Sequence, residues 1–152
     1  MNILIAAIGR ARAGAEQDLF TTYTDRLPWR VEVKEIEIKK DLATDVRRAR
    51  EGEALLAAVP AGARVVALDE RGKNEGSAGF AARLGRWRDD GQRVVAFLIG
   101  GADGLDEAVR QRADVVLSLG AMTWPHLLVR GLLAEQLYRA HCILTGHPYH
   151  RA

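Results

Sequence analysis

The last eight residues of the sequence, TGHPYHRA, contain a high density of groups that can do chemistry. His147 and His150 can exchange a proton near neutral pH, and Arg151 offers a planar fork of donors that matches a phosphate group. Tyr149 adds an aromatic face, while Pro148 restricts the backbone. The alternative is a disordered polar tail, because chain ends are often poorly ordered. We expect instead that this terminal segment belongs to an active site.

A long helix is predicted over residues 125–144, just before the terminal segment. At 100° per residue, its polar side chains fall on two narrow strips that lie almost opposite each other. One strip holds His126, Arg130 and His141, and the other holds Glu135 and Arg139. Glu135 and Arg139 have the spacing of an ordinary helix ion pair, which is worth a few tenths of a kcal/mol. The alternative is that they take part in catalysis.

Two apolar stripes fill the gaps between these polar strips, whereas a helix on the surface of a monomer normally has one. One stripe consists of Leu127, Ala134 and Tyr138, and the other of Val129, Leu132 and Leu133. Either the helix is deeply buried in its own domain, or one stripe packs on the sheet and the other on a partner chain. The sequence leaves both interpretations open.

The rest of the chain alternates between strand and helix patterns. A continuous apolar run at 2–9 indicates a strand buried on both faces, and the strict alternation at 31–38 indicates a strand near a sheet edge. Further strands are predicted at 64–69, 93–101 and 114–120. Helical patterns separate them at 16–27, 45–59, 78–89 and 106–111. This order predicts an α/β fold with a mostly parallel sheet and helices on both faces. No linker or repeat interrupts it, so we expect one domain over residues 1–152.

Three loops with unusual residues follow the third, fourth and fifth predicted strands: DERGKNEGS, GGADG and GAMTWPH. Ligands bind beyond the carboxyl ends of parallel strands, so these loops predict a pocket. The glycine turn is either a tight turn or a loop kept free of side chains for a ligand. It has neither the G-x-G-x-x-G spacing of a dinucleotide site nor the Lys-Ser/Thr of a P-loop. Ser77 and Ser118 lack the nucleophile elbow of hydrolases.

Composition sets further bounds. The chain has 152 residues, a formal charge of +2 and 48% hydrophobic residues, which is typical of a globular protein without a strong nucleic-acid footprint. The single Cys142 fits a buried position and a reducing cytoplasm. The apolar N-terminal run precedes basic residues, the reverse of a signal peptide, and no run approaches a membrane span. The pair of His in HPYH has no Cys or carboxylate at ligand spacing, so we expect no metal.

Taken together, four stretches strongly resemble the RlmH family of SPOUT-class methyltransferases: LDERGKNEGSAGFA, FLIGGADGL, LSLGAMTWPHLLVRGLLAEQLYRA and GHPYHRA. The resemblance runs nearly end to end. It implies an α/β fold with a C-terminal trefoil knot, an exception to the rule that chains are unknotted. It also implies a homodimer with active sites at the interface. The implied reaction is methylation of the N3 atom of a pseudouridine in large-subunit (23S) ribosomal RNA, with S-adenosyl-L-methionine as methyl donor.

The resemblance also assigns residues. Cofactor contacts carry over to Leu68, Gly100, Gly101 and the loop formed by Gly120, Ala121, Met122, Thr123, Trp124 and Pro125. Gly120 stands where many family members have Ser, and Trp124 where a smaller apolar residue is common. A bulky side chain at Gly101 is expected to enter the space of the cofactor.

Candidates for catalysis are the polar residues within the matching motifs: His126, Glu135, Arg139, Tyr149, His150 and Arg151. We expect Arg139 and Arg151 to stabilise charge and position RNA, and either His126 or His150 to accept the imide proton. The terminal segment is expected to reach the cofactor pocket, most simply that of the partner chain. A competing interpretation is a nucleotide- or RNA-binding module of the same fold that has lost its chemistry.

Overall fold

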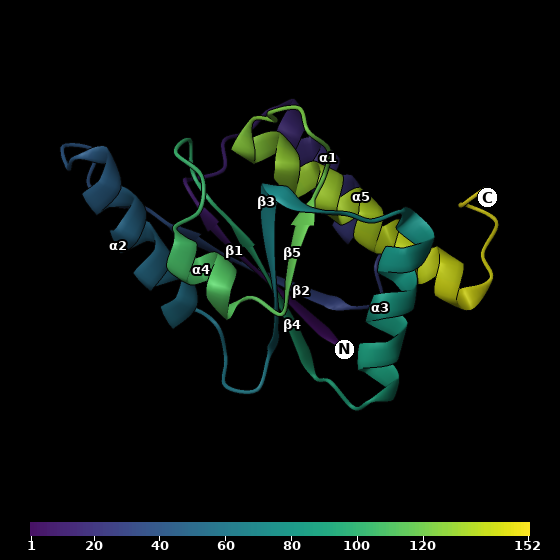
Figure 1. Cartoon of the computed structure of the whole chain (residues 1–152). Helices are drawn as coiled ribbons and strands as arrows, with labels where there is room; N and C mark the ends of the chain where they lie inside the picture. The colour runs from purple at the N-terminus through teal and green to yellow at the C-terminus, as the bar shows by residue number, and fades with distance from the viewer.

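The computed structural model describes all 152 residues and contains one five-stranded sheet with strand order β2-β1-β4-β3-β5 (Figure 1). Every neighbouring pair of strands is parallel. The strands are β1 (Asn2–Ile8), β2 (Arg30–Ile36), β3 (Arg64–Asn74), β4 (Val94–Ile99) and β5 (Val115–Ser118). The helices are α1 (Ala15–Thr24), α2 (Thr44–Ala57), α3 (Ser77–Asp89), α4 (Glu107–Arg112) and α5 (His126–Thr145). The predicted α/β fold is confirmed, and its sheet is wholly parallel.

The place of each strand follows from its side chains. β1 and β4 are almost continuously apolar and occupy the middle of the sheet, where both of their faces are buried. β2 alternates between half-buried apolar and exposed charged residues, and it lies at the edge, as predicted.

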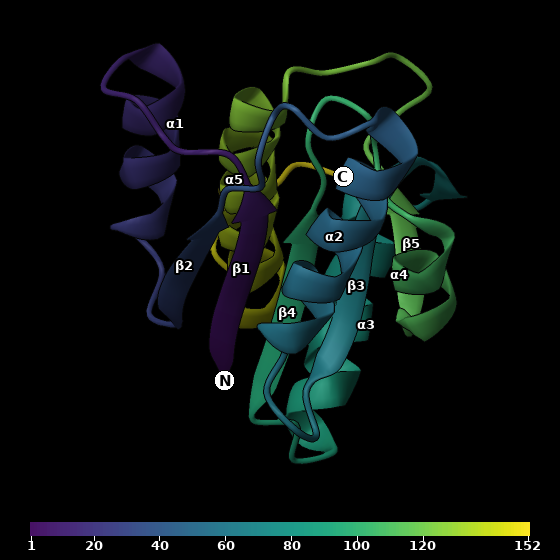
Figure 2. The same ribbon diagram turned by 90° about the vertical axis from the view of Figure 1, so that its left-hand side faces the viewer.

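Helices cover both faces of the sheet, as Figure 2 shows with α2 in front and α5 behind. On one face α1, α3 and α5 pack over the core that includes Ile5, Phe97 and Leu133. On the other face α2 and α4 bury a smaller core around Leu55 and Leu98. Alternate residues of each strand therefore serve different helical layers.

The two apolar stripes of α5 are explained largely within the chain itself. α5 lies between α1 and α3, and Leu133 from one stripe and Ala134 from the other are buried in the same core. Of the two interpretations of the stripes, deep burial accounts for both residues. The other stripe residues, Leu127, Val129, Leu132 and Tyr138, are half-buried, as is Leu128.

The structure corrects the predicted loop after the third strand. Asp69–Asn74 belong to β3, which pairs with β5 on both sides of an irregularity between Leu68 and Lys73. Such a bulge bends the strand, and local sequence does not specify it because it depends on the partner strand. At this bulge a Cβ atom on Gly72 would lie 2.7 Å from the backbone carbon and oxygen of Val116.

None of the helices is long and apolar enough to cross a membrane.

The contact at Gly72 yields a test of the bulge. Gly72→Ala forces the β3 and β5 backbones apart, so the free energy of unfolding should fall by roughly 1–3 kcal/mol. Lys73→Ala, which truncates the exposed neighbour, should stay within about 0.5 kcal/mol of wild type. Urea unfolding monitored by circular dichroism measures both. Equal stability of the two variants would contradict the close crossing.

Candidate active site

A cavity of about 960 Å³ lies at the carboxyl ends of β3, β4 and β5, and we call it the edge cavity. Its walls come from the end of β3, the β4–α4 loop, the β5–α5 loop and the first turn of α5. The predicted cofactor residues line it with the exception of Ala121: Leu68, Gly100, Gly101, Gly120, Met122, Thr123, Trp124 and Pro125. The three loops thus meet at one edge of the sheet.

The β4–α4 loop presents backbone rather than side chains. Gly101 and Gly104 form an isolated bridge, with the Gly104 N–H donating to the Gly101 carbonyl at 3.1 Å. Gly104 has a φ of 78°, which favours glycine. A Cβ on Gly100 would lie 3.0 Å from the Gly104 backbone, so the turn closes only without a side chain there.

The expectation for Gly101 is wrong in its geometry. A Cβ at this position would point away from the space between the loops and meet Ile8 Cγ2 at 3.0 Å and Glu51 Oε2 at 3.3 Å. A bulky residue here would disturb the packing between β1 and α2, so Gly101→Leu does not separate loss of folding from loss of binding.

Helix α2 holds the β4–α4 loop in place. Arg47 forms an ion pair with Asp103, and Arg48 donates from Nε to the Asp103 carbonyl at 3.1 Å. Between these arginines and the sheet lies Glu51, which is 6% exposed and whose Oε1 has no hydrogen-bond partner. Burial raises the pKa of the Glu51 carboxyl group. The sequence analysis missed Glu51, although it shares the buried face of α2 with Leu55, one turn later.

A polar floor lies below the β3 end of the cavity. The side chain of Asp69 is 4% exposed and receives two bonds from the Arg71 guanidinium, at 2.9 and 2.8 Å, which lower the pKa of Asp69. Arg110, on α4, also lines the cavity, forms an ion pair with Glu107, and has a buried Nε without a partner. These groups give one side of the cavity several fixed charges.

The first turn of α5 closes another side. Arg130, 3% exposed, donates to the Gly9 carbonyl at 2.9 Å and to Glu35 Oε2 at 2.5 Å. Its hydrogen bond lowers the pKa of Glu35. His126 lies one turn earlier and lines the edge cavity. Burial, and then the charge of Arg130, lowers the pKa of His126.

Arg130 and His141, the other members of the His126 strip, do not line the edge cavity. His141 lies near the far end of α5 and packs edge-on against Trp29, with ring centroids 5.7 Å apart. The strip is therefore a line of separate contacts. Arg130 is a structural clamp that residue type alone did not distinguish from a catalytic arginine.

The β5–α5 loop forms an exposed apolar rim. Met122 is 73% exposed and Trp124 is 40% exposed, and the Trp124 Nε1–H donates to the Leu119 carbonyl at 3.3 Å. Thr123 donates to Glu70 at 3.3 Å, which ties the rim to β3.

The other predicted catalytic residues meet elsewhere, in what we call the terminal cluster: Glu135, Arg139, Tyr149 and His150, joined by Tyr23 of α1. Arg139 pairs with Glu135 as the spacing predicts, and its guanidinium also contacts His150 Nδ1 at 3.1 Å. The Tyr149 hydroxyl donates to Glu135 at 2.8 Å, and the Arg139 guanidinium lies 4.8 Å from the Tyr149 ring centroid. Burial, with bonds to Tyr23 and Glu135, raises the pKa of Tyr149.

Tyr149 and His150 are thus held by several contacts, and the alternative of a disordered tail is wrong for them. Arg151 is exposed. No residue of the terminal segment lines the edge cavity of its own chain. Nine residues of helix separate His126 from Glu135, a rise of about 13 Å at 1.5 Å per residue. One chain therefore holds the predicted site as two separate halves.

No group of three or more His, Cys, Asp or Glu side chains is arranged to hold a metal ion. Cys142 is buried, as predicted.

The buried carboxyl group of Glu51 yields a stability prediction. Because folding raises its pKa, Glu51 binds its proton more tightly in the folded state, and stability is lost as the pH rises from about 4.5 through the folded pKa. Glu51→Gln removes the free-energy cost of burying a charged carboxylate. It should raise the free energy of unfolding at pH 7 by roughly 1 kcal/mol, with a smaller gain near pH 4.5. Exposed Glu53→Gln is the matched control. Denaturant unfolding at both pH values measures the effect. A Glu51→Gln protein less stable than wild type at pH 7 would contradict this account.

Comparison with known proteins identifies the family of the chain. The family described as "Predicted SPOUT methyltransferase" matches residues 1–150. A protein of Paramagnetospirillum magneticum is 63% identical over 151 residues, 99% of each chain, and one of Rhodospirillum centenum is 57% identical over the whole of both chains. Both are named "Ribosomal RNA large subunit methyltransferase H".

A more distant likeness concerns the fold alone. The SpoU methyltransferase AviRb of Streptomyces viridochromogenes, solved in complex with AdoMet, has a TM-score of 0.50 at 14% identity. The match covers 92% of this chain and 58% of AviRb. With a family match over nearly its whole length and relatives above 50% identity, the chain belongs to the SPOUT methyltransferase family, in the group of the large-subunit ribosomal RNA methyltransferases H.

Proposed function

We propose that the protein methylates the N3 atom of a pseudouridine in large-subunit ribosomal RNA, using S-adenosyl-L-methionine, as a single-domain cytoplasmic enzyme that works as a homodimer. The observation that carries the proposal is the edge cavity, where a glycine-rich turn, an apolar rim and His126 meet. The full-length relatives named as methyltransferases of this RNA support the substrate class.

The residues of the edge cavity fit S-adenosylmethionine. Adenine is flat and apolar with a hydrogen-bonding edge, which suits Leu68, Leu119 and Trp124 together with the backbone of the β4–α4 and β5–α5 loops. The Glu70 carboxylate suits a ribose hydroxyl or the ammonium group, whereas Asp69 is already paired with Arg71. When bound, the cofactor supplies an activated methyl group on a sulfonium.

The protein must then align the acceptor and manage one proton, because N3 of pseudouridine carries a weakly acidic imide hydrogen. His126 is the better placed of the two candidate bases: it lines the edge cavity, and its lowered pKa keeps a ring nitrogen free to accept a proton. His150 instead contacts Arg139 within the terminal cluster. Alignment alone can contribute roughly 7–11 kcal/mol in ideal cases.

The terminal cluster supplies charge. Arg139 of this cluster and the neighbouring, exposed Arg151 stabilise negative charge that develops on the imide and bind phosphate oxygens. Glu135 holds Arg139 by its ion pair, and the raised pKa of Tyr149 keeps its hydroxyl protonated as a donor.

A homodimer would join the two halves. The terminal cluster and the half-buried Leu128 and Leu132 lie on the outward side of α5, and neither leucine belongs to a core cluster. A second copy that covers this side would bury the leucines and bring its terminal segment to the edge cavity of the first chain. This arrangement gives a specific reason for two separated half-sites on one helix.

The trefoil knot is part of the same proposal. The connection from β5 to α5 crosses from one sheet edge to the face covered by α1 (Figure 2). It lines the edge cavity together with the β4–α4 loop, so the two loops pass close to each other. Threading at this point would give both loops the fixed shape that a cofactor site requires.

Blocking the edge cavity should abolish cofactor binding. Ala102 is exposed on the β4–α4 loop and lines the cavity, so Ala102→Trp fills ligand space without entering the core. Calorimetry should show an affinity for S-adenosylmethionine at least about tenfold weaker, because lost contact area and displaced ligand groups cost more than 1.4 kcal/mol. Ala61→Trp, exposed at the opposite edge, is the control. Equal affinity of both variants would refute the site.

Removing Tyr149–Ala152 should separate binding from catalysis. The deleted residues contribute no wall of the edge cavity, so affinity for S-adenosylmethionine should stay within about twofold of wild type. Loss of the charge and donor groups should slow methyl transfer to ribosomes about 100-fold or more. The measurement is transfer of a radioactive methyl group under single-turnover conditions. A truncated protein with near wild-type rate would exclude a catalytic role for the segment.

A further inference from the structure

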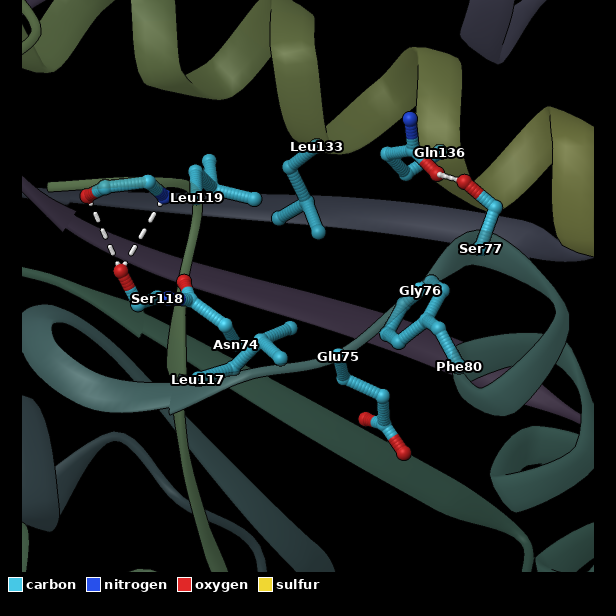
Figure 3. A pocket seen from close by; sticks show the side chains of 11 residues that line it. Asn74, Glu75, Gly76, Ser77, Phe80, Leu117, Ser118, Leu119, Leu133 and Gln136 are labelled. Carbon is cyan, nitrogen blue, oxygen red and sulfur yellow. Dashed lines mark hydrogen bonds between the residues drawn. The ribbon is translucent and has the colours of Figure 1, made fainter. Parts of the chain in front are cut away.

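A second cavity of about 400 Å³ lies on the other side of the end of β5, between the start of α3 and the middle of α5. Figure 3 shows Ser77 and Phe80 on one side of it, Leu133 and Gln136 above it, and Ser118 and Leu119 opposite. We call it the α3–α5 cavity. Its volume falls at the lower end of the roughly 300–1,000 Å³ range of small-ligand sites.

The α3–α5 cavity adjoins the edge cavity. Leu117, Leu119 and Gly120 line both, so the two cavities meet along this short segment. The Ser118 hydroxyl fixes the segment, because it donates to the Gly120 carbonyl at 3.0 Å and accepts from the Gly120 N–H at 3.1 Å. Two reactants must approach within roughly 3–3.5 Å for group transfer, so a methyl acceptor has to occupy space next to the cofactor.

The lining suits an uncharged ring. Phe80, Leu117 and Leu133 provide apolar surfaces, and no lysine or arginine lines the cavity, so it is not built for a phosphate group. Its one carboxylate, Glu75, is already paired with Arg83 at 3.0 Å. A flat heterocycle can enter without leaving a buried charge unpaired.

The polar groups are arranged to accept a hydrogen bond from a ring N–H. The Ser77 hydroxyl donates to Gln136 Oε1 at 2.7 Å, and Gln136 Nε2 donates to Glu135 at 3.1 Å (Figure 3 shows the first bond). With its hydrogen committed, the Ser77 oxygen is left as an acceptor for a ring N–H. The same chain of bonds links the cavity to Glu135 of the terminal cluster.

Building on the proposed methylation of pseudouridine, we propose that the α3–α5 cavity receives the target nucleobase after it has swung out of the RNA stack, with Ser77 accepting a hydrogen bond from its N1–H as a specificity-determining contact. The N3 atom then stays free to face the methyl group. Enzymes that modify a base hold the extruded ring in a pocket and read its hydrogen-bonding edge. The phosphates of the RNA stay outside, at the surface.

Filling the cavity tests the proposal. Ser77→Phe places a ring in the cavity, and Ala78→Phe places the same ring on the exposed side of α3 as a matched control. Methylation of ribosomes by Ser77→Phe should fall about 100-fold, since a misplaced acceptor cannot align. Affinity for S-adenosylmethionine, measured by calorimetry, should stay within about twofold. Ala78→Phe should match wild type in both assays.

A binding readout is independent of turnover. Pseudouridine nucleoside at millimolar concentration should shift the amide NMR signals of Ser77, Gly76 and Gly120 in wild type, and should not shift those of Ser77→Phe. Gln136→Met removes the partner of Ser77 at similar size, and it should raise the KM for ribosomes about three- to tenfold while leaving the melting temperature unchanged.

The outcomes separate the two proposals. The nucleobase assignment would be overturned if a folded Ser77→Phe variant were as active as the wild-type enzyme. It would also be overturned if the nucleoside shifted NMR signals only in other regions. In both cases the methyltransferase proposal would stay intact. A wild-type protein that neither binds S-adenosylmethionine nor methylates ribosomes would overturn the proposed function itself.

Discussion

Arg130 carries its charge inside the protein, where the carbonyl oxygen of Gly9 and the carboxylate of Glu35 replace the water that it has lost. These partners lie 121 and 95 residues away in the sequence, at the ends of β1 and β2. A buried guanidinium without such partners would cost several kcal/mol, so the contact forces α5 to begin over the carboxyl edge of the sheet. His126, one turn before Arg130, is thereby fixed at the wall of the edge cavity.

The direction of α5 then separates the chemistry into two places. Its first turn contributes to the edge cavity, while Glu135 and Arg139 lie farther along and anchor the terminal segment. Because the helix is rigid, no movement of the terminal segment brings Glu135 to the cavity of the same chain. A partner chain can supply the second half. The α3–α5 cavity lies between these regions and adjoins the first, which makes it a natural place for the acceptor ring.

Much of the fold could be predicted because it depends on local patterns. The continuous apolar run of β1 indicated a strand buried on both faces, and alternation placed β2 near the edge. The extension of β3 to Asn74 could not be predicted, since it arises from pairing with β5. For α5, periodicity showed two apolar stripes but could not tell that α1 and α3 would cover both sides.

The predicted site divides in the same way. The strand pattern and the family resemblance together predicted that the cofactor residues lie at one edge of the sheet. The direction of the Gly101 Cβ could not be predicted, because it depends on how α2 packs against the sheet. Glu51 and Arg130 look like surface charges by residue type, and only burial distinguishes them. Contacts of Tyr149 with Tyr23 join residues 126 positions apart and lie beyond any spacing argument.

Mixed dimers test the composite site most directly. One chain carries Ala102→Trp and keeps its terminal segment, and the other lacks Tyr149–Ala152 and keeps its edge cavity; each alone should be inactive. If the terminal segment acts across the interface, an equal mixture should recover about a quarter of wild-type activity, because half of the dimers are mixed and each holds one complete site. A mixture as inactive as its parts, despite heterodimer formation shown by native mass spectrometry, would contradict the account.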